Sequence, residues 1–187
     1  MNQRHLEYCA GAEWAETVRQ HVIPGTTGGL HLGEHLLEAG PGPGLTTDIL
    51  ATMVPRLTAV EIDGELAAAL AARFAGTHVD VHCGDATAMP FPDGHFSSAI
   101  CLTMLHHLPD AAAQDRLFAE MRRVVRPGGF VIGNDSMDSA EFREFHEGDI
   151  CTPIDPASLA PRLMAAGLVD VAVDTNPFAF KFVGRVP

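Results

Sequence analysis

Three glycines alternate with other residues in the stretch EAGPGPGLTTDIL, at Gly40, Gly42 and Gly44. Glycine lets a backbone turn tightly or approach a ligand closely, because it carries no Cβ. The loop leads into an expected helix, whose first N–H groups are free to bind a ligand. The second gap, between Gly42 and Gly44, has one residue where the dinucleotide pattern GxGxxG has two. No Gly-Lys-Ser/Thr follows, and this excludes a P-loop. The stretch predicts a nucleotide-like ligand, with a ligand-free turn as the alternative.

Two acidic residues follow at the ends of the next two expected strands. Glu61 comes about twenty residues after the loop, where a carboxylate can accept hydrogen bonds from both hydroxyls of a ribose. We choose Glu61 over Asp63, because Asp63 has the type and position of a helix cap. Asp85 ends the following strand and can accept from an adenine amino group. Each residue alone also fits a surface or turn role, so the prediction of a nucleoside site rests on their concurrence.

Short apolar runs alternate with helical patterns and supply the elements that position these residues. Strands are expected over 35–39, 57–62, 79–83, 99–102, 130–133, 169–173 and 178–183. Helices are expected over 6–22, ending at Pro24-Gly25, and over 46–54, 65–74, 114–125 and 155–166. Such alternation predicts an α/β fold with a largely parallel sheet, helices on both faces and ligands at the carboxyl edge.

Length and charge narrow the class of protein. The chain has 187 residues, of which 47% are hydrophobic, and this favours one domain, with a helical cap over 1–30 and a core over 31–187. The net charge of −12 disfavours unaided binding to nucleic acid or to anionic membranes. Four scattered cysteines and the lack of a signal peptide or spanning segment favour a cytoplasmic protein with reduced thiols. The oligomeric state stays open.

The motifs together resemble those of class I S-adenosylmethionine-dependent methyltransferases. They are Glu38-x-Gly40-x-Gly42-x-Gly44, VEID at 60–63, GDA at 84–86, MPFPDGHF at 89–96, LHHL at 105–108 and RRVVRPGG at 122–129. The resemblance spans about residues 36–133. It implies a Rossmann-like seven-stranded mixed sheet in the order 3-2-1-4-5-7-6 with the last strand antiparallel, and S-adenosyl-L-methionine as cofactor. Ser97 departs from the family, which usually has Asp there, and we expect only a local effect.

The resemblance implies roles on the adenosine side of the cofactor. Glu61 would hold the ribose hydroxyls, and Ile62 would pack on the adenine. Asp85 would accept from the adenine amino group, and the N–H of Ala86 would reach a ring nitrogen.

Other residues are assigned to the methionine side. The three loop glycines would pass the methionine part and the ribose, and Leu102 and Thr103 would line the methionine moiety through backbone groups. Glu38 would orient the loop. Tyr8, on the N-terminal helix, is a further candidate for covering the cofactor, with ordinary packing as the alternative.

The candidate catalytic residues are His106 and His107, which follow the fourth strand on the expected acceptor side. A histidine near its ordinary pKa of about 6.5 can remove a proton from an acceptor. We favour His106, since His107 more often contacts the cofactor pocket in the proteins that this chain resembles. Packing without catalysis is the alternative for both. Methyl transfer from a sulfonium needs mainly alignment and desolvation, so a dedicated base is not required.

No metal site is predicted. The acidic stretch over 134–151 contains Asn134, Asp135 and His146, which could be metal ligands as in catechol-type methyltransferases. Strand four, however, ends Cys101-Leu102-Thr103 without the Asp that would complete such a site. A solvated acidic lid is the better interpretation.

The sequence therefore predicts an S-adenosylmethionine-dependent methyltransferase that acts on a small-molecule metabolite. One alternative is a cofactor-binding protein without transferase activity. A second is an RNA methyltransferase, because VEID is similar to a motif of rRNA adenine dimethylases. Those enzymes carry Asn/Asp-Pro-Pro-Tyr/Phe after strand four, where this chain has Leu102-Thr103-Met104.

Overall fold

One mixed sheet positions the candidate residues that follow the ends of its strands. The structure, a computed structural model, describes residues 2–187, except for the side chain of residue 3. Within these residues the strands are β1 (His35–Ala39), β2 (Arg56–Glu61), β3 (Val79–Cys83), β4 (Phe96–Leu102), β5 (Val125–Ser136), β6 (Val169–Thr175) and β7 (Ala179–Arg185). Their order is β3-β2-β1-β4-β5-β7-β6, and β7 runs antiparallel to β5 and β6. The predicted α/β fold and strand order are confirmed.

The central strands read as apolar runs because helices cover both of their faces. All residues of β4 are buried, as are four of the five in β1. β5 begins earlier than predicted, because Val125 pairs with Phe96 and the pairing resumes at Phe130 opposite Ser98. Gly129 lies in this irregular part, where a Cβ would approach the carbonyl oxygen of Ser97 to 2.1 Å. Only glycine fits between the two strands at that point.

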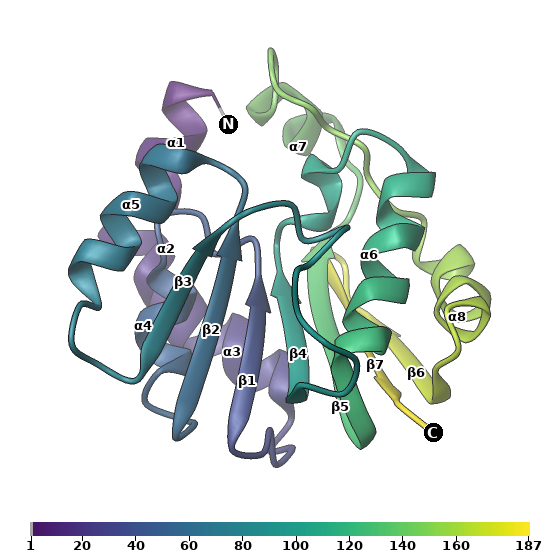
Figure 1. Cartoon of the computed structure of the whole chain (residues 1–187). Coiled ribbons are helices and arrows are strands. Elements are labelled where there is room, and N and C mark those ends of the chain that lie inside the picture. The colour runs from purple at the N-terminus through teal and green to yellow at the C-terminus, as the bar shows by residue number, and fades with distance from the viewer. Residues whose placement is uncertain (1) are drawn as a thin grey trace.

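Helices form a layer on each side of the sheet. They are α4 (Leu45–Leu50), α5 (Gly64–Arg73), the short 3₁₀ turn η2 (Leu105–His107), α6 (Ala111–Val124), α7 (Ala140–Phe145) and α8 (Pro156–Ala165). On one face α6 and α8 bury Phe118 and Leu159 in the larger core cluster. On the other face α4 buries Leu50 in a second cluster. Figure 1 shows this three-layer arrangement.

The N-terminal segment differs from the single helix that the sequence predicts. It consists of α1 (Gln3–Cys9), α2 (Ala12–Thr17), the π-type turn η1 (Val18–Val22) and α3 (Ile23–Thr27). The break after α1 falls at Gly11, a poor helix former. The predicted end at Pro24 is wrong, because the wider turn η1 precedes it and Pro24 occupies the first turn of α3, where its missing N–H costs little. The segment ends at Gly28, which has a φ of 55°.

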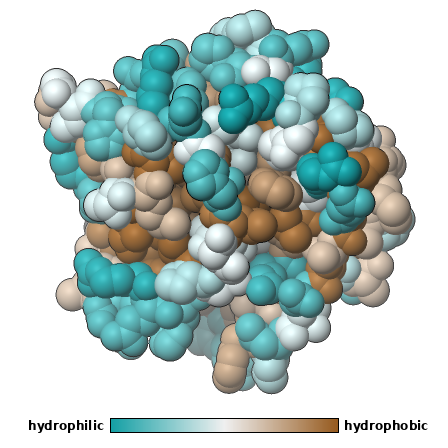
Figure 2. Space-filling view, turned by 90° about the horizontal axis from the view of Figure 1, so that it is seen from below, coloured by the Kyte–Doolittle hydropathy of each residue, from teal (hydrophilic) through white to brown (hydrophobic). Residues whose placement is uncertain are grey.

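The carboxyl ends and the amino ends of the parallel strands have different surroundings. Figure 1 shows α1 and α7 above the carboxyl ends of these strands. Figure 2 shows the opposite side of the molecule, where hydrophobic residues form a band between hydrophilic ones. Ser97 lies near that opposite end, and its Oγ accepts hydrogen bonds from the backbone N–H groups of Glu34 and His35, both at 3.0 Å. The departure from the family pattern at Ser97 therefore lies away from the carboxyl edge.

The described residues contain no helix long and apolar enough to cross a membrane. All four cysteines are free thiols. The expectation of a cytoplasmic protein stays a prediction.

Candidate active site

The glycine loop has the backbone conformation that its sequence predicts. Gly40, Gly42 and Gly44 have φ values of 67°, 55° and 84°, all in the left-handed region that favours glycine. A Cβ at Gly44 would lie 2.2 Å from Cδ1 of Leu70 and 2.4 Å from a guanidinium nitrogen of Arg73. Gly44 therefore packs against α5, while Gly40 and Gly42 line a cleft at the carboxyl edge of the sheet.

Glu38 lies beneath this loop and holds the start of α4. Its carboxylate accepts hydrogen bonds from the hydroxyls of Thr46 and Thr47, the latter at 2.7 Å. Complete burial raises its pKa to about 7, although the two threonine hydrogen bonds oppose the shift. Glu38 is absent from the described lining of the cleft, which fits the predicted role of orienting the loop.

Glu61 connects the loop to the end of β2. One carboxylate oxygen accepts from the N–H of Gly42 and the other from the N–H of Asp63, both at 2.9 Å. The side chain is buried and lines the cleft. Asp63 caps α5 by accepting from the N–H groups of Glu65 and Leu66. Both residues line the cleft, and Asp63 caps α5 in addition, so the choice of Glu61 for the ribose stays a prediction.

Two of the three residues assigned to the adenine reach the cleft. Ile62 and Asp85 line it, and Ile62 is 71% exposed, which is unusual for a large apolar side chain. Asp85 Oδ1 accepts from the N–H of Thr87 at 2.7 Å, which fixes the carboxylate at the end of β3. Ala86 is buried and its side chain packs in the larger core cluster.

The end of β4 is strained where it meets the cleft. Thr103 has a φ of 50°, uncommon for a residue that is not glycine and costly for a β-branched one. Such strain is typical of functional sites. Leu102 and Thr103 both line the cleft, and their assignment to the methionine side stays a prediction.

The cleft has a volume of about 690 Å³. Three N-terminal residues, His5, Cys9 and Trp14, form part of its wall. Tyr8 is absent from the described lining and instead packs its ring against Trp14 and Phe145, at centroid distances of 5.6 and 5.5 Å. The N-terminal segment therefore borders the cleft through neighbours of Tyr8.

Four histidine rings meet at the wall of the cleft. We call His5, His106, His107 and His146 the histidine cluster. His5 comes from α1, His106 and His107 from η2, and His146 follows α7. One ring nitrogen from each lies within 4.8 Å of those of the other three. His5 and His107 line the cleft, and His106 and His146 are buried behind them.

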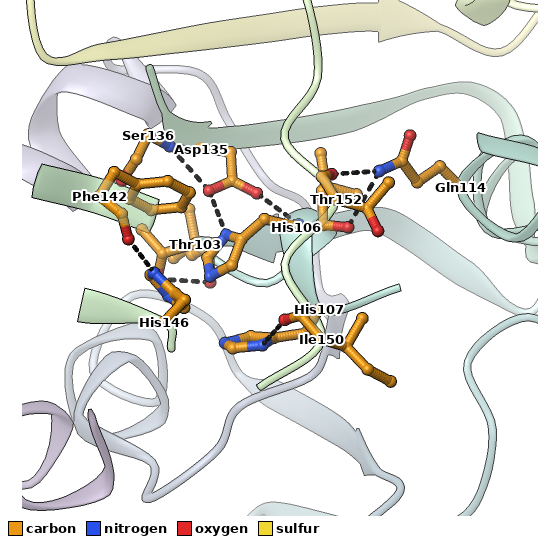
Figure 3. Close-up of polar contacts among 12 residues, drawn as sticks. Thr103, His106, His107, Gln114, Asp135, Ser136, Phe142, His146, Ile150 and Thr152 are labelled. Carbon is orange, nitrogen blue, oxygen red and sulfur yellow. Dashed lines mark hydrogen bonds and ion pairs between the residues drawn. The ribbon is translucent and has the colours of Figure 1, made fainter. Parts of the chain in front are cut away.

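In three of these rings Nδ1 hydrogen-bonds to an oxygen atom of a neighbouring residue, which fixes the orientation of the ring (Figure 3). The Nδ1 of His106 bonds to Oδ1 of Asp135 at 2.6 Å, and Oδ2 of the same carboxylate accepts from the His106 backbone N–H. The Nδ1 of His146 bonds to the Phe142 carbonyl at 2.7 Å. The Nδ1 of His107 lies 3.3 Å from the Ile150 carbonyl. In a neutral ring held in this way, Nε2 is the nitrogen without the proton.

These three Nε2 atoms are buried and have no hydrogen-bond partner among residues 2–187, whereas Nδ1 of His5 lies 3.5 Å from Oδ2 of Asp149. A buried polar atom without a partner costs about 1–3 kcal/mol, so three in one cluster need an explanation. Burial, together with the neighbouring histidines, lowers the pKa of His5 to about 4 and that of His107 to about 3. Burial also lowers the pKa of His146. These three rings are neutral at pH 7.

The interpretation of 134–151 as a solvated lid is wrong at three positions, of which the first, Asn134, is 6% exposed. Asp135 is 2% exposed because it is the next-to-last residue of β5, and His146 is 3% exposed because α7 folds back onto η2. The cluster also contains His5, which no spacing in the sequence connects with His106 and His107, so the lack of an Asp at the end of β4 is not decisive for a metal site.

In sequence, this chain resembles known methyltransferases. A family model described as "Methyltransferase domain" matches residues 37–133. A probable S-adenosylmethionine-dependent methyltransferase of Mycolicibacterium smegmatis is 32% identical over 97 residues, which cover 52% of this chain and 36% of that protein. Ribosomal RNA small subunit methyltransferase A of Aromatoleum aromaticum is 34% identical over 111 residues, which cover 51% of this chain and 42% of that protein. The chain thus spans less than half the length of these two relatives.

A solved structure shows the same fold. Phosphoethanolamine N-methyltransferase 2 of Haemonchus contortus, in complex with S-adenosyl-L-methionine, matches 95% of this chain and 53% of its own with a TM-score of 0.74 and 14% identity. At that identity the likeness concerns the fold alone.

Proposed function

This chain belongs to the S-adenosylmethionine-dependent methyltransferases of the class I fold, and we propose that it transfers the methyl group of that cofactor to a small-molecule acceptor. In the reaction the carbon–sulfur bond of the sulfonium breaks, a bond from the methyl carbon to the acceptor atom forms, and the acceptor loses a proton. S-adenosylhomocysteine is the second product.

One observation carries this proposal: the glycine loop, Glu61 and Asp85 come from three successive strand ends and line a single cleft. Its volume of about 690 Å³ lies within the ordinary range of small-molecule sites, about 300–1,000 Å³. The carboxylate of Glu61 uses one lone pair on each oxygen for a backbone N–H, so each oxygen keeps a second lone pair for a ribose hydroxyl. The residues present fit the cofactor of the family.

Within the proposal, His106 and His107 serve the acceptor side of the cleft. His107 reaches the cleft, whereas His106 lies behind it and is held by Asp135. An isolated base works best when its pKa is near the operating pH, and a pKa of about 3 makes His107 a poor one. His107 is therefore a weak candidate for a dedicated base, and methyl transfer can proceed through alignment and desolvation alone.

The net charge of the chain favours a small molecule over RNA as the methyl acceptor. The net charge of −12 repels phosphate groups, which supply most of the non-specific affinity for nucleic acids. The β4 end also reads Leu102-Thr103-Met104 in place of the Asn/Asp-Pro-Pro-Tyr/Phe pattern. RNA is the second candidate, because several relatives are named as rRNA methyltransferases.

The proposal is tested by incubating the protein with methyl-labelled S-adenosylmethionine and cell extract, separated into metabolite and RNA fractions. We expect label in a molecule of the metabolite fraction and release of S-adenosylhomocysteine. The Glu61→Ala variant serves as the control with impaired cofactor binding. Label in RNA alone would select the second candidate. Binding of the cofactor without any labelled product would instead identify a binding protein without transferase activity.

A further inference from the structure

The histidine cluster has the composition and geometry of a metal site. We propose that its four imidazoles bind one divalent first-row transition-metal ion, with Zn²⁺ as the reference ion, at the acceptor end of the cleft. This inference does not depend on methyl transfer, because it concerns binding that can be measured in the protein without cofactor or acceptor.

The four ligand atoms are close enough to share one ion. They lie within 4.8 Å of one another, whereas the nitrogens around a tetrahedral zinc, with bonds of about 2.0–2.1 Å, are about 3.4 Å apart. The rings are also in mutual contact, since the centroids of His106 and His107 are 4.1 Å apart and those of His5 and His146 are 4.4 Å apart. Small inward rotations of the rings would reach the shorter separation.

The ligand nitrogens are available and correctly oriented. Metal-binding histidines almost always bond through their other nitrogen to a carboxylate or a carbonyl, which fixes the tautomer and the ring. His106, His107 and His146 do so, to Asp135, Ile150 and Phe142 respectively. Their Nε2 atoms are buried and have no partner among the described residues. A bound cation would satisfy all of them at once.

Alternative explanations for the cluster fit less well. A stack of protonated rings would place like charges in direct contact, because the ring centroids of His106 and His107 are 4.1 Å apart. Neutral rings cannot hydrogen-bond to one another through Nε2, because all three of these nitrogens are acceptors. The cluster thus needs a shared partner that binds the lone pairs of these three Nε2 atoms.

The chemistry of the ligands selects the class of ion. Imidazole nitrogen suits Zn²⁺, Cu²⁺, Ni²⁺ and Fe²⁺, whereas Mg²⁺ and Ca²⁺ require oxygen ligands. The nearby carboxylates also favour a cation: Asp135 bonds to His106, and Oδ2 of Asp149 lies 3.5 Å from Nδ1 of His5.

The position of the site has a consequence for the cleft. Its ligands come from α1, from η2 and from the residue after α7, and Figure 1 shows α1 and α7 over the carboxyl edge of the sheet. An ion bound by His5 and His146 would fasten these two elements to η2, beside the cleft wall that His5 and His107 form. The ion would stabilise the wall at the acceptor end.

The test uses protein without a histidine tag, because a tag binds the same metals. The protein is stripped with a chelator and titrated with Co²⁺, which reports tetrahedral coordination by a visible absorption band, and with Zn²⁺ in competition. We expect one equivalent per chain, with a Kd of about 1 µM or lower, and a higher melting temperature in the loaded form. Mg²⁺ should not compete.

Three variants make the test specific. His5→Ala and His146→Ala each remove one ligand and should weaken Co²⁺ binding by about 10-fold or more. His31→Ala removes an exposed histidine outside the cluster and should bind as the wild type does. Circular dichroism of the metal-free forms verifies that each variant is folded. The proposal is wrong if the wild type binds no stoichiometric ion, or if either cluster variant keeps the wild-type affinity.

Discussion

The Nδ1 of His106 lies 2.6 Å from Oδ1 of Asp135, and both side chains are almost fully buried. The second carboxylate oxygen accepts from the His106 backbone N–H at 3.0 Å, so one side chain fixes both the ring and the turn that carries it. Asp135 stands at the end of β5, directly beside the end of β4 from which η2 follows. The register between these two strands therefore determines where Nε2 of His106 points.

Asp135→Asn should impair the histidine cluster while leaving the fold intact. The amide keeps the shape of the carboxylate but loses the charge that orients and polarises the ring of His106. We expect Co²⁺ affinity to fall by about 10- to 100-fold, as for other partners of metal-binding histidines. Asp138→Asn is the matched control, because Asp138 lies in the same segment, is exposed and forms an ion pair with Arg143. Equal affinities for the two variants would show that Asp135 does not position the cluster.

Glu61→Ala should weaken binding of S-adenosylhomocysteine by about 1.5–3 kcal/mol, the range for hydrogen bonds to a charged group. Isothermal titration calorimetry measures this loss, and NAD should not bind to either protein. Asp63→Ala is the control, because it removes the cap of α5 and should lower stability by about 1 kcal/mol with a smaller effect on affinity. The assignment fails if Asp63→Ala abolishes binding and Glu61→Ala does not.

Glu38 should make the stability of the unliganded protein depend on pH. Its pKa is about 7 when folded and 4.5 in the unfolded chain, so the folded state binds the additional proton between these values. Its contribution to stability is thus full below pH 4.5 and falls as pH rises, by about 3 kcal/mol up to pH 7. Urea unfolding of the wild type and of Glu38→Gln at pH 5 and pH 8 measures it. The variant should gain relative stability at the higher pH, and a constant difference would contradict the shift.

Nucleic-acid binding should be negligible at physiological salt. The charge of −12 motivates this expectation, and filter binding with total RNA tests it, with and without S-adenosylhomocysteine. The same assay at low salt is the informative comparison, because any attraction between the protein and the phosphate groups of RNA would be much stronger there. Micromolar binding at physiological salt would restore RNA as the acceptor.

Local chemistry in the sequence determined the cofactor side of the site. Left-handed backbone favours glycine, so Gly40, Gly42 and Gly44 predicted the loop. An acidic residue before a helix predicted the cap at Asp63, and Glu61 remained for the ligand. The alternation of apolar and helical segments predicted the sheet, because each of these patterns depends on neighbours within a few residues.

Only the tertiary structure decided the acceptor side. His5, His106 and His146 belong to α1, η2 and the end of α7, elements far apart in the chain, and no periodicity relates them. Tyr8 illustrates the same limit: its helix was predicted, but the break at Gly11 and the packing on Phe145 set which of its neighbours reach the cleft. Contacts between distant segments depend on how whole layers pack on the sheet, which local patterns do not encode.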